Sequence, residues 1–215
     1  MFFWYSDQES KDQIIQYAMD TYQISPEETM KAIEAADKAQ QAFSDEMHSA
    51  GQKILEEIQR NGSFAVVLAA RPYQTDSLVN HDLPALLAGM GIPVLTADSL
   101  PLEKDGELKK SALDIVNNYH ARMLSSAITA ARNPNLEYIQ IVSFGCGHDA
   151  YLSDEIIRVM KEISGKTPLV LKLDESDVQG PMRIRVRSFI ETISMRRSKS
   201  KTKQVNHLDD PYPVK

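Results

Sequence analysis

A cysteine between two glycines is the residue of this sequence with the clearest capacity for chemistry. Gly145, Cys146 and Gly147 follow a short apolar run, and glycines on both sides allow a tight turn with room for a bulky group beside the sulfur. The thiolate could bind a metal or act as a nucleophile, although a lone cysteine can also be a small apolar core residue. Cys146 is the only cysteine, so an iron–sulfur or zinc site here would need ligands from elsewhere.

Further polar residues follow the other short apolar runs. His81 and His148 could act as bases or metal ligands, or could be structural. Arg183 and Arg185 could bind an anion, but we favour their pairing with the acidic residues Asp174 and Glu175. The residues expected to line a site are Arg71, Tyr73, Asp76, Asn80, His81, His148, Asp149, Asp174, Glu175, Arg183 and Arg185.

The apolar runs themselves predict four buried strands that alternate with helices. Such alternation is typical of an α/β fold with a parallel sheet, here a four-stranded flavodoxin-like or Rossmann-like one. The carboxyl ends of parallel strands meet at one edge, so we expect Arg71, Tyr73, His81, Cys146, Asp149 and Glu175 to share a cleft there. The predicted strands are Phe64–Ala69, Pro93–Thr96, Tyr138–Val142 and Pro168–Leu173, and the predicted helices lie near 84–90, 111–131, 153–163 and 183–195.

Two further regions flank the predicted α/β domain of residues 63–195. Residues 1–62 predict a helical arm, in which Ser25, Pro26 and Glu28 form a capping box at the start of a second helix. We allow a break of that helix near Gly51. Residues 196–215 are basic and poor in apolar side chains, which predicts a disordered tail.

Charge and motif content exclude several classes of protein. The formal net charge of the chain is −6, and residues 196–215 carry six basic and two acidic side chains. The rest of the chain therefore has a net charge of −10, which argues against a nucleic-acid-binding face. There is no apolar run long enough to cross a membrane and no signal peptide, and we expect a cytoplasmic protein. The sequence has no phosphate-binding loop, no dinucleotide fingerprint and no serine nucleophile elbow.

Four ordered blocks resemble a known family. They are Leu68–Tyr73 with Asp76 and Asn80-His81, Val94–Ser99, Ser143–Ala150, and Asp174-Glu175 before Arg183–Arg185. Together they are similar to the C-terminal dehydratase-like region of the large activators (CoA-substrate-specific enzyme activases) of 2-hydroxyglutaryl-CoA dehydratase.

The resemblance implies that Cys146 is one ligand of a [4Fe–4S] cluster whose other cysteines come from neighbouring domains or partner subunits. It implies electron transfer that supports radical dehydration of a 2-hydroxyacyl-CoA, with Arg71, Tyr73 and His81 donating hydrogen bonds to cluster sulfurs. The isolated chain should then be inactive and hold no intact cluster. Gln74, Ser77 and Asp82 stand where the family leads us to expect His, Pro and Gly, so we assign no catalytic residue.

Two other functions remain open from the sequence. The chain could be a non-catalytic interaction or assembly module, in which the helical arm and the α/β domain dock onto a larger complex. It could also be a CoA-binding domain without a cluster.

Overall fold

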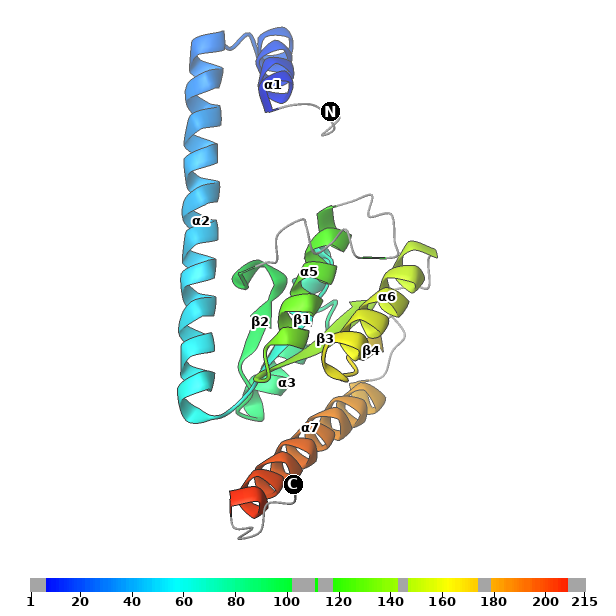
Figure 1. Ribbon diagram of the computed structural model, residues 1–215. Helices are drawn as coiled ribbons and strands as arrows, with labels where there is room; N and C mark the ends of the chain where they lie inside the picture. Colours follow the sequence, from blue (N-terminus) through cyan, green and yellow to red (C-terminus); the bar gives the residue numbers. More distant parts are fainter. Residues whose placement is uncertain (1–6, 102–110, 112–117, 143–146, 174–178, 209–215) are drawn as a thin grey trace.

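A four-stranded parallel sheet lies at the centre of the molecule (Figure 1). This computed structural model describes residues 7–101, 111, 118–142, 147–173 and 179–208. The strand order is β2-β1-β3-β4, with every neighbouring pair parallel, which confirms the predicted α/β fold. The strands are β1 (Ala65–Ala69), β2 (Val94–Thr96), β3 (Leu136–Val142) and β4 (Leu169–Lys172).

Helices cover both faces of the sheet, and each face has its own apolar core. On one face, α5 (Asn118–Arg132) and α6 (Gly147–Ser164) pack with alternate side chains of β1 and β3, such as Val67 and Tyr138. On the other face, α3 (Leu83–Gly89) and α7 (Gln179–Leu208) pack against Val66 and Ile139. Burial on both sides explains why the strands appear in the sequence as continuous apolar runs.

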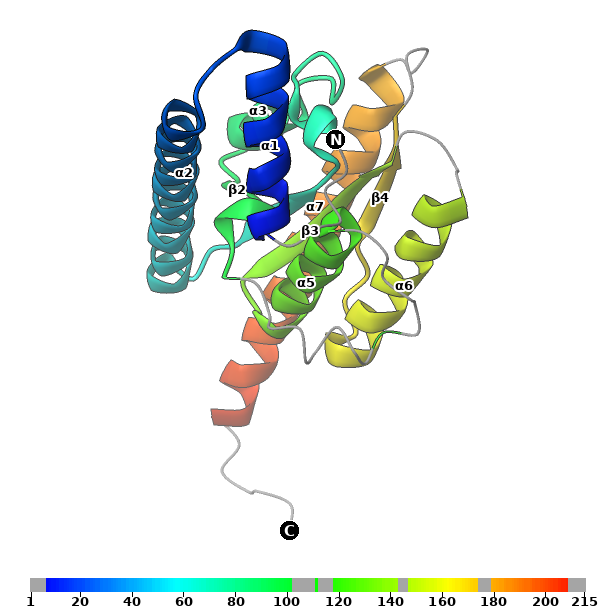
Figure 2. The same ribbon diagram turned by 90° about the horizontal axis from the view of Figure 1, so that it is seen from above.

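The N-terminal region consists of two helices, α1 (Asp7–Tyr22) and α2 (Pro26–Asn61). Ser25 caps α2 as the sequence predicts, because its Oγ accepts a hydrogen bond from the amide of Glu28 at 3.2 Å. Lys11 of α1 pairs with Asp37 of α2 at 3.6 Å. The two views show α1 and the N-terminal half of α2 extending past the carboxyl ends of the strands, on the side of β1 and β2 (Figures 1 and 2).

The allowed break near Gly51 is wrong, because α2 is one continuous helix of 36 residues. Gly51 is buried where α2 crosses the short helical turn η2 (Ala97–Ser99), and a Cβ atom at this position would lie 1.9 Å from the carbonyl oxygen of Ser99. The glycine is therefore required by a close approach of two backbones and not by a change of direction.

The C-terminal helix is longer than the sequence predicts. It continues to Leu208, so residues 196–208 are helical where we expected a disordered tail; residues 209–215 lie outside the described residues. Arg197 donates hydrogen bonds to the carbonyls of Ser63 and Pro134, both at 2.9 Å, and its guanidinium lies 5.5 Å from the ring centre of Phe64. None of the helices described is long and apolar enough to cross a membrane.

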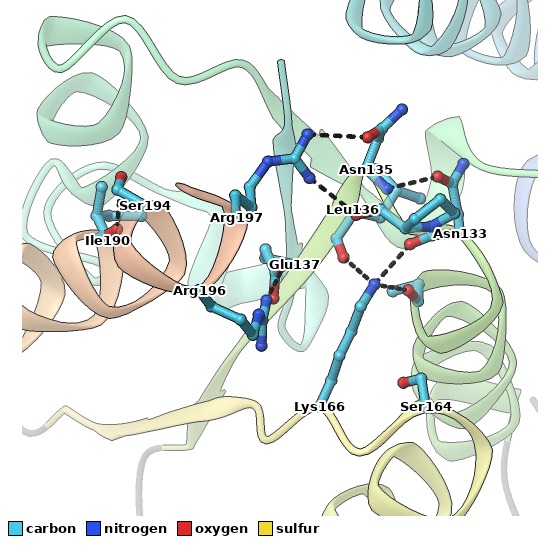
Figure 3. Close-up of polar contacts among 12 residues, drawn as sticks. Asn133, Asn135, Leu136, Glu137, Ser164, Lys166, Ile190, Ser194, Arg196 and Arg197 are labelled. Carbon is cyan, nitrogen blue, oxygen red and sulfur yellow. Dashed lines mark hydrogen bonds and ion pairs between the residues drawn. The ribbon is translucent and has the colours of Figure 1, made fainter. Parts of the chain in front are cut away.

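A lysine connects the end of α5 to the start of β3 at the amino edge of the sheet (Figure 3). Lys166, in the connection before β4, donates from Nζ to the carbonyls of Ala130 at 3.0 Å, Asn133 at 2.6 Å and Leu136 at 2.7 Å. These carbonyls belong to the end of α5, the turn after it and the start of β3. The ammonium group thus satisfies acceptors that the end of a helix leaves without intrahelical partners.

Candidate functional site

The carboxyl ends of β1 and β3 lie side by side at the point where the strand order changes direction. The chain leaves β1 towards β2 on one side, and it leaves β3 towards β4 on the other. In open parallel sheets, ligands bind at this position. The loop after β1 brings Arg71, and the connection after β3, which contains Cys146, leads into α6 at Gly147.

A buried carboxylate joins these two segments. Arg71 Nη2 lies 2.5 Å from Oδ1 of Asp149, which is in the first turn of α6. The side chain of Asp149 is 9% exposed and that of Arg71 is 30% exposed, so the ion pair is largely shielded from water. An acidic residue at the start of a helix is also favoured by the helix dipole.

A third chain segment contributes His120, which the sequence analysis did not select. It lies in the first turn of α5 and is buried, and its Nε2 is 3.7 Å from the same oxygen of Asp149. The sequence around His120 carries no motif, and Asp149, to which it lies close in space, is 29 positions later in the chain. Only the packing of α5 against α6 brings the imidazole to the site.

Three of the predicted site residues shape the loop after β1. Asn80 is buried and its Nδ2 donates to the carbonyls of Gln74 and Thr75, each at 3.1 Å. Asp76 Oδ1 accepts from the amide of Leu78 at 2.9 Å. His81 has a left-handed backbone with φ of 53°. Asn80 and Asp76 therefore hydrogen-bond within their own loop, whereas Arg71 reaches across to α6.

A glutamine with no protein partner lies on the face that α5 and α6 cover. Gln140 is fully buried, and neither its Oε1 nor its Nε2 has a hydrogen-bond partner. Tyr138, two positions earlier on the same face, donates from its hydroxyl to the carbonyl of Met123 at 2.7 Å. Since α5 begins at the carboxyl edge, His120 lies one turn beyond Met123 in the direction of Gln140. Gln140 therefore shares a face and a level with His120.

The remaining predicted residues are exposed, or their side chains lie outside the described residues. Tyr73 is 49% exposed in η1 (Pro72–Thr75). Arg183 and Arg185 lie exposed on α7, and Arg185 donates to the carbonyl of Val170 in the edge strand β4 at 2.7 Å. Cys146, Asp174, Glu175 and the side chain of His148 lie outside the described residues, so the common cleft and the pairing of the arginines with Asp174 and Glu175 stay predictions.

The described residues do not by themselves form a metal site or a CoA pocket at this edge. Within the ranges that the structure describes, no three His, Cys, Asp or Glu side chains are grouped to hold a metal ion. A cavity of about 30 Å³ lies at the ends of β1 and β2, lined in part by Thr96, Asp98 and Arg122. It is large enough for a water molecule and too small for an acyl group.

Comparison with known proteins identifies the N-terminal part of the chain. Residues 2–100 match a family model described as "CoA enzyme activase uncharacterised domain". The match covers just under half of the chain and includes α1, α2, β1, β2 and Arg71, so this part is a CoA-enzyme-activase-related domain. Searches of curated proteins and of solved structures gave no match.

Proposed function

We propose that this chain is a dehydratase-like domain of a protein related to the activators of 2-hydroxyacyl-CoA dehydratases, and that Cys146 gives one thiolate ligand to a [4Fe–4S] cluster. The observation that carries the proposal is the position of Cys146 in the short connection between β3 and α6, where Arg71 crosses from the end of β1 to Asp149. The family match of residues 2–100 supports the same assignment.

This chain can supply only part of the ligand set of such a cluster. A [4Fe–4S] cluster takes about four thiolates, and this sequence contains one cysteine. The missing ligands would come from another domain or a partner subunit. When bound, the cluster would supply the one-electron transfer that supports radical dehydration of a 2-hydroxyacyl-CoA.

The chain's own residues would control the electrostatics beside Cys146. Arg71 carries a permanent positive charge, and its N–H groups are the donors that hydrogen-bond cluster sulfurs in other proteins. Asp149 neutralises this charge and fixes the direction of the guanidinium through the 2.5 Å contact. Only two residues, Gly147 and His148, separate Cys146 from Asp149, so this pair is close to the thiolate along the chain.

Exposed apolar side chains on the N-terminal helices support a second candidate function, assembly with a larger complex. Tyr17, Tyr22 and Phe43 are 56%, 63% and 58% exposed. Large apolar groups gathered on a projecting pair of helices are typical of a protein–protein contact. The assembly function requires no iron.

Iron analysis of the complex separates the two functions. The tagged protein would be isolated anaerobically from its own cells with whatever partners accompany it, and iron, sulfide and visible absorption would be measured. Cys146→Ser should lose most of the iron and the absorption band, while the partners remain. Tyr151→Phe, an exposed position on α6, is the matched control and should retain both. A wild-type complex without iron, or a Cys146→Ser complex with unchanged iron, would refute the ligand role and leave assembly as the function.

A CoA-binding domain without a cluster would behave differently again. Acyl-CoA should then raise the melting temperature of the iron-free chain. The proposal above predicts no such change for the isolated chain.

A further inference from the structure

The loop after β1 presents apolar side chains to solvent at the carboxyl edge of the sheet. In this loop, residues 72–82, Leu78 is 86% exposed and its neighbour Val79 is 38% exposed. Among the large apolar side chains that the structure describes, Leu78 has the largest exposed fraction. We call Leu78 and Val79 the apolar tip. Neighbouring apolar side chains held in solvent are typical of a protein–protein contact.

Hydrogen bonds within the loop fix the position of the apolar tip. Oδ1 of Asp76 accepts from the amide of Leu78 at 2.9 Å, and the carbonyl of Asp76 accepts from the amide of Asn80 at 3.0 Å. The side chain of Asn80 is buried and donates to two carbonyls of η1, so the second half of the loop folds back on the first. The tip lies at the turn between the two halves and is therefore pre-organised for binding.

The free chain adopts this loop conformation at a cost. His81 and Asp82 are consecutive residues with a left-handed backbone, with φ of 53° and 57°, which is uncommon for residues other than glycine. Oδ1 of the buried Asn80 has no hydrogen-bond partner. Backbone strain and unpaired buried polar atoms are concentrated at functional sites, so both features favour a binding role for the loop.

Two carboxylates flank the apolar tip. Asp76 and Asp82 are exposed, and neither forms an ion pair within the part of the chain that the structure describes. Protein interfaces have an apolar centre and a polar rim, and the charges of the two partners are complementary. A surface that receives this tip would therefore be an apolar pocket with lysine or arginine at its rim.

We propose that the apolar tip is the docking surface for the partner protein that supplies the missing cluster ligands, and that this partner offers an apolar pocket with a basic rim. This inference rests on the proposed function. The loop follows directly after Arg71, which pairs with Asp149 in the first turn of α6. The connection that contains Cys146 leads into the same turn, so a protein that brings ligands there also approaches the loop.

A charge placed at the tip tests the docking in the intact complex. Leu78→Asp should remove both the partner and the iron from the complex isolated anaerobically, because a carboxylate is costly in an apolar pocket. Met195→Asp is the matched control, since Met195 of α7 is 63% exposed and precedes Arg196 at the amino edge, and it should retain both. Urea unfolding of the isolated chains should give equal stability for Leu78→Asp and the wild type, because Leu78 is exposed.

A photo-crosslinking residue identifies what the tip contacts. Leu78→benzoylphenylalanine should crosslink to one protein, at a surface that contains lysine or arginine, and that protein should contain about three further cysteines. Met195→benzoylphenylalanine should not give this product. A crosslink to a second copy of this chain would overturn the proposal, because a second copy adds only one cysteine.

The outcomes for iron separate this inference from the proposed function. If Cys146→Ser loses the iron while Leu78→Asp keeps both the iron and the partner, the docking surface is refuted and the ligand role of Cys146 stands. If the wild-type complex contains no iron, the ligand role is refuted, and with it a partner that supplies ligands, even where the tip binds a protein.

Discussion

The two edges of the sheet hold their buried charges in different ways. At the amino edge, the ammonium group of Lys166 donates to three backbone carbonyls and the guanidinium of Arg197 to three others, and Arg196 pairs with the buried Glu137 beside them. At the carboxyl edge, Arg71, Asp149 and His120 contact one another, and a buried glutamine lacks any protein partner. Backbone carbonyls are fixed acceptors and satisfy a cation permanently, whereas side-chain partners can be exchanged for a ligand. The comparison predicts that substitutions at the amino edge cost more stability than substitutions at the carboxyl edge.

Replacement of Lys166 should have the largest effect on the free energy of unfolding. Lys166→Met keeps the aliphatic length but leaves three carbonyls at the end of α5 and the start of β3 without their shared donor. We expect the free energy of unfolding to fall by about 3 kcal/mol. Urea unfolding measures this, with Lys161→Met, an exposed position on α6, as a control that should change little. Equal stability of the two variants would contradict the structural role of the amino edge.

The Arg196–Glu137 ion pair should have the next largest effect. Glu137 is a buried residue of β3, with a side chain that is 2% exposed, so Arg196→Met leaves a carboxylate inside the sheet face without this partner. The loss should be about 2 kcal/mol, and the double variant Arg196→Met with Glu137→Met should recover most of it. A double variant that is less stable than Arg196→Met alone would show that the carboxylate has another essential role.

Replacement of Gln140 should stabilise the protein, in contrast to the two substitutions above. Gln140→Met has nearly the same volume and removes two polar atoms that have no protein partner, so it should raise the free energy of unfolding by about 1 kcal/mol. Stabilisation at the carboxyl edge is expected where a site is built for a ligand at the expense of the free protein. Thermal unfolding of the two proteins measures the difference. A destabilised Gln140→Met would mean that the amide is already satisfied in the free protein.

The last expected effect is a pH dependence of stability at the amino edge, which is gradual and small per pH unit. Burial lowers the pKa of Lys166 from its ordinary value of 10.5 to about 8. Between these two values the unfolded chain binds the proton more tightly than the folded chain, so stability should rise with pH in this range. The rise should approach about 1 kcal/mol per pH unit relative to Lys166→Met, which lacks the titrating group. Parallel curves for the two proteins would show that the three carbonyls hold the ammonium form throughout.

The fold was predictable because its signals are local. The strand β1 is a continuous apolar run, and Ser25 marks the start of α2 because its side chain caps an amide three residues later. The predictions fail where the environment of a residue is set by a partner that is distant in the sequence. Glu137 interrupts the apolar pattern and delayed the predicted start of β3 to Tyr138, yet it is buried because Arg196 reaches it from α7.

The site was predictable only in part for the same reason. Strand ends point to Arg71 and Asp149 because parallel topology brings the exits of β1 and β3 together. His120 lies in the interior of the sequence between strands, and nothing near it predicts that α5 starts beside Asp149. Gly51 is a second example. The sequence alone does not distinguish a glycine that allows a close contact, here with Ser99, from a glycine that ends a helix.

The contact at Gly51 also has a mechanical consequence. A helix of 36 residues is about 54 Å long. At Gly51 the backbone of α2 packs directly against the backbone of η2, with no side chain between them. Sliding α2 by one residue would drive a Cβ into the Ser99 carbonyl, so this contact fixes the position of the helix along its axis. Ile54, Leu55 and Ile58 of the same helix pack on the core that α5 and α6 cover, so the C-terminal part of α2 is held against the sheet at several points.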